Sequence, residues 1–132
     1  MGLALRLLLD TCTFIWLTSA PDRLGTQAKR ALNAEQVEVL LSDVSVMEIC
    51  TKWQAKKLGL PAPPRMWIEE QAGIWQLTRL PITPATCYRA TELPEVHRDP
   101  FDRLLISQAI DNGLTLLTPD EWIYKYPVMA LW

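Results

Sequence analysis

The segment His97-Arg98-Asp99-Pro100-Phe101-Asp102-Arg103-Leu104-Leu105-Ile106-Ser107-Gln108-Ala109 predicts a helix with a carboxylate on its apolar side. Asp99 precedes a proline, which disfavours helical dihedrals at Asp99, and proline suits the first helical position. Asp99 is therefore the predicted N-cap. The helix is expected to run to about Asn112 and to stop at Gly113.

The two sides of this helix are marked by residues at helical spacing, which are Phe101, Leu105, Ile106 and Ala109 on the apolar side and Arg103, Ser107 and Asp111 on the polar side. Asp102 falls among the apolar group. It can be a first-turn acid favoured by the helix dipole, a contribution of about 0.3 to 1 kcal/mol. Alternatively it is functional, because a carboxylate turned toward the core costs several kcal/mol unless it is paired, protonated or bound to a metal.

The composition indicates one globular domain covering residues 1–132, because the chain is long enough for one core and too short for two. The net charge of −2 gives no bulk electrostatic argument for nucleic-acid binding, so any phosphate contact must come from a local basic patch. Lys52, Lys56, Lys57, Arg98 and Arg103 are the candidates for such a patch.

The cysteines and the apolar first residues bear on the compartment. Cys12, Cys50 and Cys87 are odd in number and widely spaced, which suits a reducing cytoplasm better than a disulfide framework or a zinc site. The run Leu3–Leu9 is interrupted by Arg6 and ended by Asp10, so we interpret it as a buried strand and not as a signal peptide. We expect a soluble, cytoplasmic protein without a membrane association.

Continuous apolar runs alternate with helical patterns along the chain. Strands are expected at residues 6–9, 36–41, 74–80, 114–118 and 128–131, and helices at 11–18, 21–32, 42–58, 64–73, 83–93 and 100–112, with a short one starting near Pro119. This alternation predicts a three-layer α/β/α fold around a mainly parallel sheet.

Four acids are expected at one edge of that sheet, because ligands of open parallel sheets bind beyond the carboxyl ends of the strands. Asp10 ends the first strand, Asp120 follows the strand at 114–118, and Glu48 and Asp102 lie early in helices that start at the same edge. Each acid also has a structural explanation. Asp10 and Asp102 can cap helices, Asp120 can be a first-turn acid, and Glu48 can form a surface ion pair with Lys52 four residues on.

A cluster of carboxylates stays ionised only with a cation, since like charges raise one another's pKa. Oxygen ligands without histidine or cysteine select Mg²⁺ or Mn²⁺, and these ions suit phosphoryl transfer or phosphodiester hydrolysis. The sequence has no glycine-rich phosphate loop, no Ser-His-Asp pattern and no zinc spacing. We interpret the single histidine, His97, as a helix-entry or surface residue and not as a general base.

Four segments in this order resemble a PIN-domain ribonuclease, most closely the VapC-type toxins of toxin-antitoxin modules. They are Leu8-Leu9-Asp10-Thr11, Ser45 with Glu48-Ile49 and the following 52–60 segment, His97 to Ile106, and Leu116-Leu117-Thr118-Pro119-Asp120. The resemblance covers nearly the whole chain. Cys12 departs from it, because many members of the family carry histidine at that position.

The resemblance implies that Asp10, Glu48, Asp102 and Asp120 are the catalytic, metal-binding acids, with Asp99 as an auxiliary acid. It implies endonucleolytic RNA cleavage that depends on Mg²⁺ or Mn²⁺, with the metal activating water. It further implies a homodimer and neutralisation by a small antitoxin protein encoded beside the toxin. Thr11 and Thr118 can orient a ligand water or cap a helix, and Lys52, Lys56, Arg98 and Arg103 can contact RNA phosphates.

Three other functions remain open. A housekeeping RNA-processing nuclease would carry the same acids, and an inactive module binding RNA or protein would keep the fold. A phosphoacceptor receiver domain has this length and an Mg²⁺ site at strand ends. However, it would require adjacent acids after the first strand and a lysine ending the last one, and residues 128–132 contain no lysine.

Overall fold

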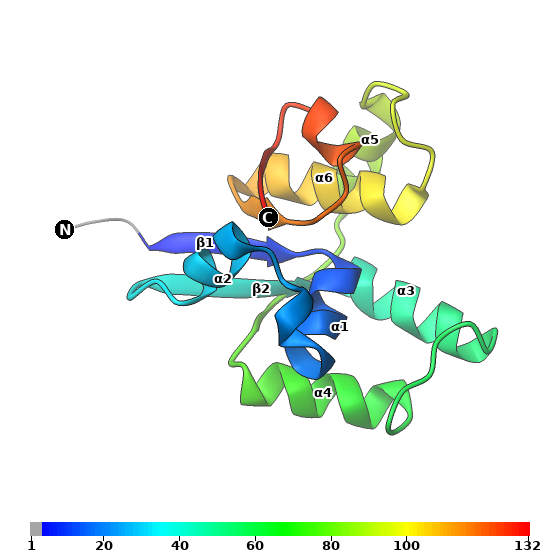
Figure 1. The fold of residues 1–132 in the computed structure, drawn as a ribbon. Helices are drawn as coiled ribbons and strands as arrows, with labels where there is room; N and C mark the ends of the chain where they lie inside the picture. The colour runs from blue at the N-terminus through cyan, green and yellow to red at the C-terminus, as the bar shows by residue number, and fades with distance from the viewer. Residues whose placement is uncertain (1–3) are drawn as a thin grey trace.

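The computed structural model describes residues 4–132, and in them five strands form one sheet with helices on both faces (Figure 1). The elements in chain order are β1 (Leu5–Leu9), α1 (Thr11–Ser19), the 3₁₀ turn η1 (Pro21–Arg23), α2 (Thr26–Leu32), β2 (Val37–Ser42), α3 (Asp43–Gln54), α4 (Pro64–Ile74), β3 (Thr78–Leu80), α5 (Pro84–Glu92), α6 (Pro100–Asn112), β4 (Thr115–Leu117), the 3₁₀ turn η2 (Ile123–Lys125) and β5 (Met129–Leu131). Leu3, the start of the apolar run that we interpret as a buried strand, lies outside the described residues. None of the helices that residues 4–132 form is long and apolar enough to cross a membrane.

The sheet has the order β3-β2-β1-β4-β5, and every neighbouring pair is parallel. The predicted three-layer α/β/α architecture is therefore confirmed. The chain moves outward from β1 to β3 and then crosses back to β4 and β5 on the other side of β1. Strand order thus reverses between β1 and β4, which is the place where open α/β sheets bind ligands.

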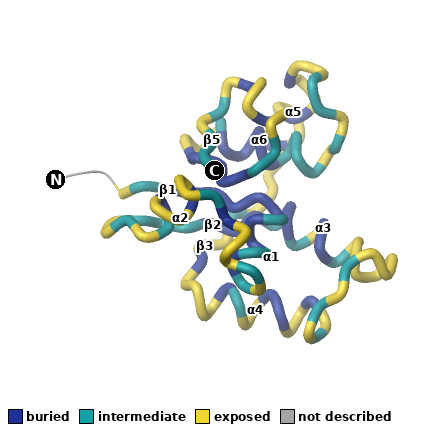
Figure 2. Tube along the Cα trace, viewed as in Figure 1, coloured by how far each residue is buried: buried dark blue, intermediate teal, exposed yellow. Residues whose placement is uncertain are grey.

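The central strand β1 is buried on both faces, and this explains its unbroken run of leucines. Leu7 and Leu9 pack into a core formed with α1, α2 and α4, whereas Leu8 packs into a second core formed with α6. All three leucines are fully buried. Figure 2 shows the buried residues along the central strands and on the helix faces turned toward them.

The polar side of α6, formed by Arg103, Ser107 and Asp111, packs against α5 and does not face the solvent. We call these three residues the polar stripe of α6. Arg103 donates to the carbonyl oxygens of Ala90 and Leu93 in and after α5, and Ser107 donates to Thr86 O. Asp111 forms an ion pair with Arg89. Helix α6 is consequently fixed on both sides, by apolar packing on the sheet and by polar contacts with α5, and its first turn is held in place at the sheet edge.

The observed ends of the helices show where local sequence signals were sufficient to predict a boundary. Asp99 caps α6 as predicted, with Oδ1 accepting from Phe101 N at 2.9 Å, and Gly113 ends it in the left-handed conformation at φ 64°. The predicted helix to residue 58 instead ends at Gln54, because Lys56 adopts φ 60°. Residues 74–77 do not belong to a strand, since α4 continues to Ile74 and β3 begins only at Thr78.

The predicted helix at residues 21–32 is split into η1 and α2 at Gly25. A Cβ atom at Gly25 would overlap the backbone and ring of Trp132, so the close approach of Trp132 requires glycine there. Gln27 N donates to Trp132 O at 3.2 Å and fixes this contact. The glycine at the interruption is thus explained by a residue more than one hundred positions away.

Candidate metal centre

Four acids lie where the chain leaves the carboxyl ends of the strands. Asp10 follows β1 and caps α1, with Oδ1 accepting from Thr13 N at 2.8 Å, and it is almost fully buried. Glu48 is buried in the second turn of α3, Asp102 is half-buried in the first turn of α6, and Asp120 follows β4. These elements flank the point where the strand order reverses.

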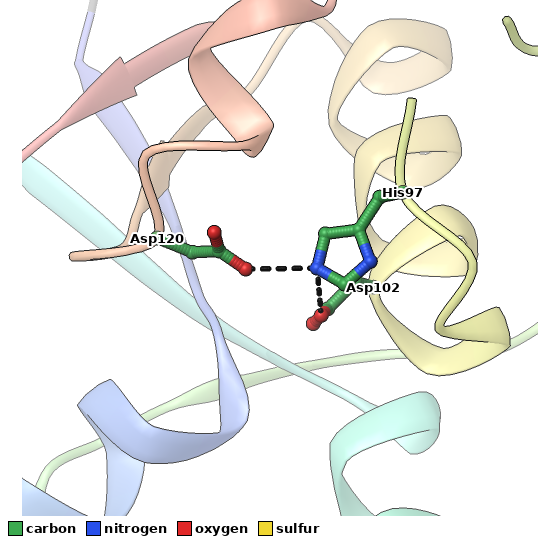
Figure 3. Close-up of side chains that lie close together, drawn as sticks. All are labelled: His97, Asp102 and Asp120. Atoms are coloured by element: carbon green, nitrogen blue, oxygen red, sulfur yellow. Dashed lines mark hydrogen bonds and ion pairs between the residues drawn. The ribbon is translucent and has the colours of Figure 1, made fainter. Parts of the chain in front are cut away.

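Asp102 and Asp120 are joined by His97 (Figure 3). His97 Nε2 lies 3.0 Å from Asp102 Oδ2 and 2.9 Å from Asp120 Oδ2. One ligand atom from each of the three side chains lies within 4.8 Å of the others. The backbone N–H of Asp99 donates to His97 Nδ1 at 3.2 Å, so the proton of the neutral ring is on Nε2, between the two carboxylates.

His97 does lie at the entry to α6, two residues before its cap Asp99, but the interpretation of His97 as a surface residue was wrong. Its side chain is only 19% exposed and belongs to the acid cluster. Residues 93–99 lie between α5 and α6 in irregular structure, where no periodicity predicts side-chain direction. The loop is held by His97 N, which donates to Tyr126 OH at 2.7 Å, and by Arg103, which donates to His97 O at 3.2 Å. The only signal in the sequence was a single histidine just before two acids.

Glu48 combines the two interpretations that the sequence left open. Its Oε2 forms the expected pair with Lys52 Nζ at 2.6 Å. Its Oε1 accepts from the hydroxyl of Thr11 at 2.7 Å, and the carboxylate is buried. The Thr11 hydroxyl also lies 3.0 Å from Ser45 Oγ. Glu48 is thus held from α1 and from its own helix, facing the site and not the solvent.

Thr118 holds the backbone of another acid, Asp120, in place. Its Oγ1 accepts from Asp120 N at 3.1 Å. Thr118 is fully buried and Thr11 nearly so. In this structure the Thr11 hydroxyl contacts the Glu48 carboxylate and the Thr118 hydroxyl contacts the backbone of Asp120, and neither threonine caps a helix through its side chain.

Ionisation is disfavoured at two of the acids, Asp102 and Asp10. Burial, followed by the charge of Asp99, raises the pKa of Asp102 to about 7, with smaller contributions from Glu48 and Asp120 and an opposing one from His97. Burial also raises the pKa of Asp10, against hydrogen bonds from Thr118 and Thr13. The site thus holds more negative charge than its neighbours compensate.

Cys12 follows Asp10 by two residues and contacts it through the thiol, whose Sγ lies 3.3 Å from Asp10 Oδ1. Burial and the charge of Asp10 raise the pKa of this thiol, and the charge of Asp102 adds to the effect. Cys12 therefore stays protonated, as a weak donor to Asp10 and not as a thiolate ligand.

This donor set fits a divalent cation. Asp102 and Asp120 bring carboxylate oxygens within 4.8 Å of each other beside His97, which acts as their donor and not as a ligand. The charge of Glu48 acts on Asp102, and the charges of Asp10 and Asp102 both act on Cys12. Carboxylate oxygens suit Mg²⁺ and Mn²⁺. A bound cation would also remove the charge repulsion that raises the pKa of Asp102.

The basic residues predicted to contact RNA differ in their surroundings. Lys56 and Arg98 are exposed, and Lys52 is half-exposed while paired with Glu48. Arg103 is used differently, because its guanidinium donates to the carbonyls of Ala90, Leu93, Pro94 and His97 at 2.8–3.2 Å. These bonds hold the loop that carries His97.

Comparisons with known proteins identify the family. The PIN domain family profile matches residues 7–128. Ribonuclease VapC22 of Mycobacterium tuberculosis is 29% identical over 115 residues, which cover 86% of each chain.

Solved structures share the fold at low identity. The structure of VapBC2 from Rickettsia felis bound to a promoter DNA fragment has a TM-score of 0.70 at 14% identity, covering 96% of this chain and 98% of the other. DNA-bound VapBC from Salmonella typhimurium has a TM-score of 0.66 at 18% identity, covering 96% and 97%. Since the family profile spans residues 7–128, nearly the whole chain, this chain belongs to the PIN domain family.

Proposed function

We propose that this protein is a metal-dependent endoribonuclease that acts as the toxin of a type II toxin-antitoxin system. The observation that carries the proposal is that Asp102 and Asp120 come together through His97 at the carboxyl ends of the strands, where Asp10 and Glu48 also follow strands β1 and β2. The similarity to a ribonuclease named VapC22 supports the choice of RNA as substrate.

Asp102, Asp120, Asp10 and Glu48 would hold a divalent cation, Mg²⁺ or Mn²⁺. When bound, this cation lowers the pKa of water and offsets negative charge on a phosphodiester. The protein's own contribution is positional. Thr11 orients Glu48, Thr118 orients the Asp120 backbone, and His97 donates to both Asp102 and Asp120. Asp99 acts as an auxiliary acid through its charge on Asp102.

Lys52, Lys56 and Arg98 would contact the phosphates of the RNA strand. Arg103 is left out of this set, because its guanidinium is occupied by backbone carbonyls. Water orientation by Thr11 and Thr118 stays a prediction, and it is compatible with hydroxyls that already lie against the acids.

The test is cleavage of mixed cellular RNA by the purified chain with Mg²⁺ or Mn²⁺, with EDTA, and with the Asp102→Asn variant. We expect discrete fragments that disappear both in EDTA and in the variant. Asp111→Asn is the matched control, because Asp111 lies in the same helix but pairs with Arg89 on the α5 side. It should cleave as the wild type does.

Equal cleavage by the wild type and Asp102→Asn would contradict the proposal, and so would fragments that persist in EDTA. No cleavage under any condition would favour the inactive binding module. The receiver-domain alternative is wrong, since the observed order β3-β2-β1-β4-β5 differs from the 2-1-3-4-5 order of receiver proteins.

The toxin role and its partners need their own test. Several of the similar structures are toxin-antitoxin complexes, among them one from Klebsiella pneumoniae, and this supports a small antitoxin partner in the cytoplasm. We expect induced expression to arrest growth, Asp102→Asn not to do so, and coexpression of the neighbouring small gene to restore growth. Unimpaired growth with active enzyme would favour the housekeeping nuclease. Light scattering after size exclusion should give twice the mass of one chain if the protein is a homodimer.

A further inference from the structure

The turn that follows Asp120 presents two aromatic rings and a cation to solvent beside the acid cluster. Trp122 is 54% exposed and Tyr124 is 46% exposed, whereas Ile123 between them is fully buried. Lys125 Nζ lies 4.2 Å from the centroid of the Trp122 ring. In a 3₁₀ turn residues three apart eclipse one another, which explains this cation–π contact.

The turn is held firmly against the site. Asp120 Oδ1 accepts from Trp122 N at 2.9 Å, while Oδ2 of the same carboxylate contacts His97. Tyr124 OH donates to Thr118 O at 3.2 Å. Ile123 and Tyr126 are buried on the inner side and anchor the turn in the α6 core. The Cα atom of Trp122 is therefore within about 7 Å of that of Asp120, the reach of two residues.

We propose that Trp122, Tyr124 and Lys125 form a docking surface for an unpaired nucleotide next to the scissile phosphate. We call these three residues the aromatic turn. An aromatic ring stacks on the base, and Lys125 contacts the adjoining phosphate. This inference rests on the proposed ribonuclease function and names the residues that receive the strand.

Chemistry favours a nucleotide as the occupant. Two exposed rings with a cation beside one of them match the bases and the phosphates of a single strand. A cation at this edge also offsets repulsion between RNA phosphates and the acids, which the net charge of −2 does not do. Stacking tolerates any base but requires that the base is unpaired, so the aromatic turn selects single-stranded over duplex RNA.

The test measures binding separately from cleavage. In the Asp102→Asn background, with Mg²⁺, the Kd of a fluorescein-labelled single-stranded RNA is measured by anisotropy for Trp122→Ala, Trp122→Phe and Lys125→Ala. Trp75→Ala is the matched control, because Trp75 is 43% exposed but precedes β3 at the opposite edge of the sheet. The same substitutions in the active chain are assayed for KM and kcat, and thermal melting confirms folding.

We expect Trp122→Ala to weaken single-stranded binding by roughly 5- to 150-fold, the range for loss of one stacked base. Trp122→Phe should recover most of the affinity, Lys125→Ala should reduce the salt dependence, and Trp75→Ala should have no effect. KM should rise with Trp122→Ala while kcat stays constant, and binding of the same sequence as a duplex should not change.

The failures are distinguishable. If the active chain cleaves RNA and Trp122→Ala binds and cleaves as Trp75→Ala does, the ribonuclease function stands and the docking surface is refuted, leaving the aromatic turn to a protein partner. If the active chain does not cleave RNA and Asp102→Asn does not bind it, both proposals fail together. Equal losses on single-stranded and duplex RNA would also overturn base stacking.

Discussion

Asp102 is an acid whose ionisation is opposed both by burial and by a neighbouring charge. Burial and the Asp99 charge raise its pKa to about 7. The folded protein therefore retains a proton that the unfolded chain loses near pH 4. As the pH rises from about 4 to about 7, the unfolded state binds fewer protons than the folded state, so the contribution of Asp102 to the free energy of unfolding falls. Above about pH 7 the loss is complete.

The first prediction is that the metal-free protein has a carboxyl group titrating near pH 7. Carbon-13 NMR of labelled aspartate side chains should show this midpoint, and the resonance should be missing in Asp102→Asn. Over the same pH interval, urea denaturation should show the variant gaining stability relative to the wild type. A midpoint near pH 4 for every aspartate would contradict the assignment.

The second prediction separates the two roles of Asp99, which caps α6 and carries a charge near Asp102. Asp99→Asn keeps a good N-cap but removes the charge, so the Asp102 midpoint should fall, while stability to urea measured near pH 4, before the raised pKa of Asp102 has cost stability, stays nearly constant. Asp99→Ala should lower the midpoint and also cost about 1 kcal/mol of stability. If both variants shift the midpoint without any difference in stability, the cap is not contributing.

At the scale of elements, the polar stripe of α6 supports the site from behind. Arg103 donates to carbonyls of α5 and of the following loop, and that loop carries His97. The site therefore depends on a side chain that does not touch the proposed metal position. Only the helix contact reveals this, since periodicity alone marks Arg103 as polar and solvent-facing.

The third prediction is that Arg103→Ala lowers the free energy of unfolding by about 2–3 kcal/mol, because charged hydrogen bonds are lost and carbonyls are left unpaired. Urea denaturation measures this. Arg98→Ala, five residues earlier and exposed, is the control and should change stability by less than about 0.5 kcal/mol. Equal effects of the two substitutions would assign Arg103 no structural role.

Elements with strong local signals were predictable. The leucine run of β1, the Asp99-Pro100 start of α6 and its Gly113 stop are determined by neighbouring residues. His97, Gly25 and the burial of Glu48 are not, because each depends on a contact with a distant segment. The backbone of His97 is held by Tyr126, and the Glu48 carboxylate is held by Thr11. The close approach of Trp132 requires glycine at position 25. The resemblance to the family supplied Glu48, while helical periodicity alone favoured a surface ion pair.

At the scale of the whole molecule, the two cores are joined through shared elements, and we propose that the chain is one domain. Leu8 of β1 packs in the α6 core and Leu9 in the α1 core, and α3 contributes Val44 to the former and Ile49 to the latter.

Neither core can lose its packing without exposing β1, so the fourth prediction is a single cooperative unfolding transition. The urea unfolding transitions measured by far-UV circular dichroism and by tryptophan fluorescence should coincide. Leu8→Ala and Leu9→Ala should each lower the free energy of unfolding by about 2–5 kcal/mol. The urea midpoint should fall accordingly, and the two signals should still change together. If Leu8→Ala instead produced a second, earlier transition seen by one probe alone, the α5–α6 layer would be an independent unit, and the acid site would be divided between two units.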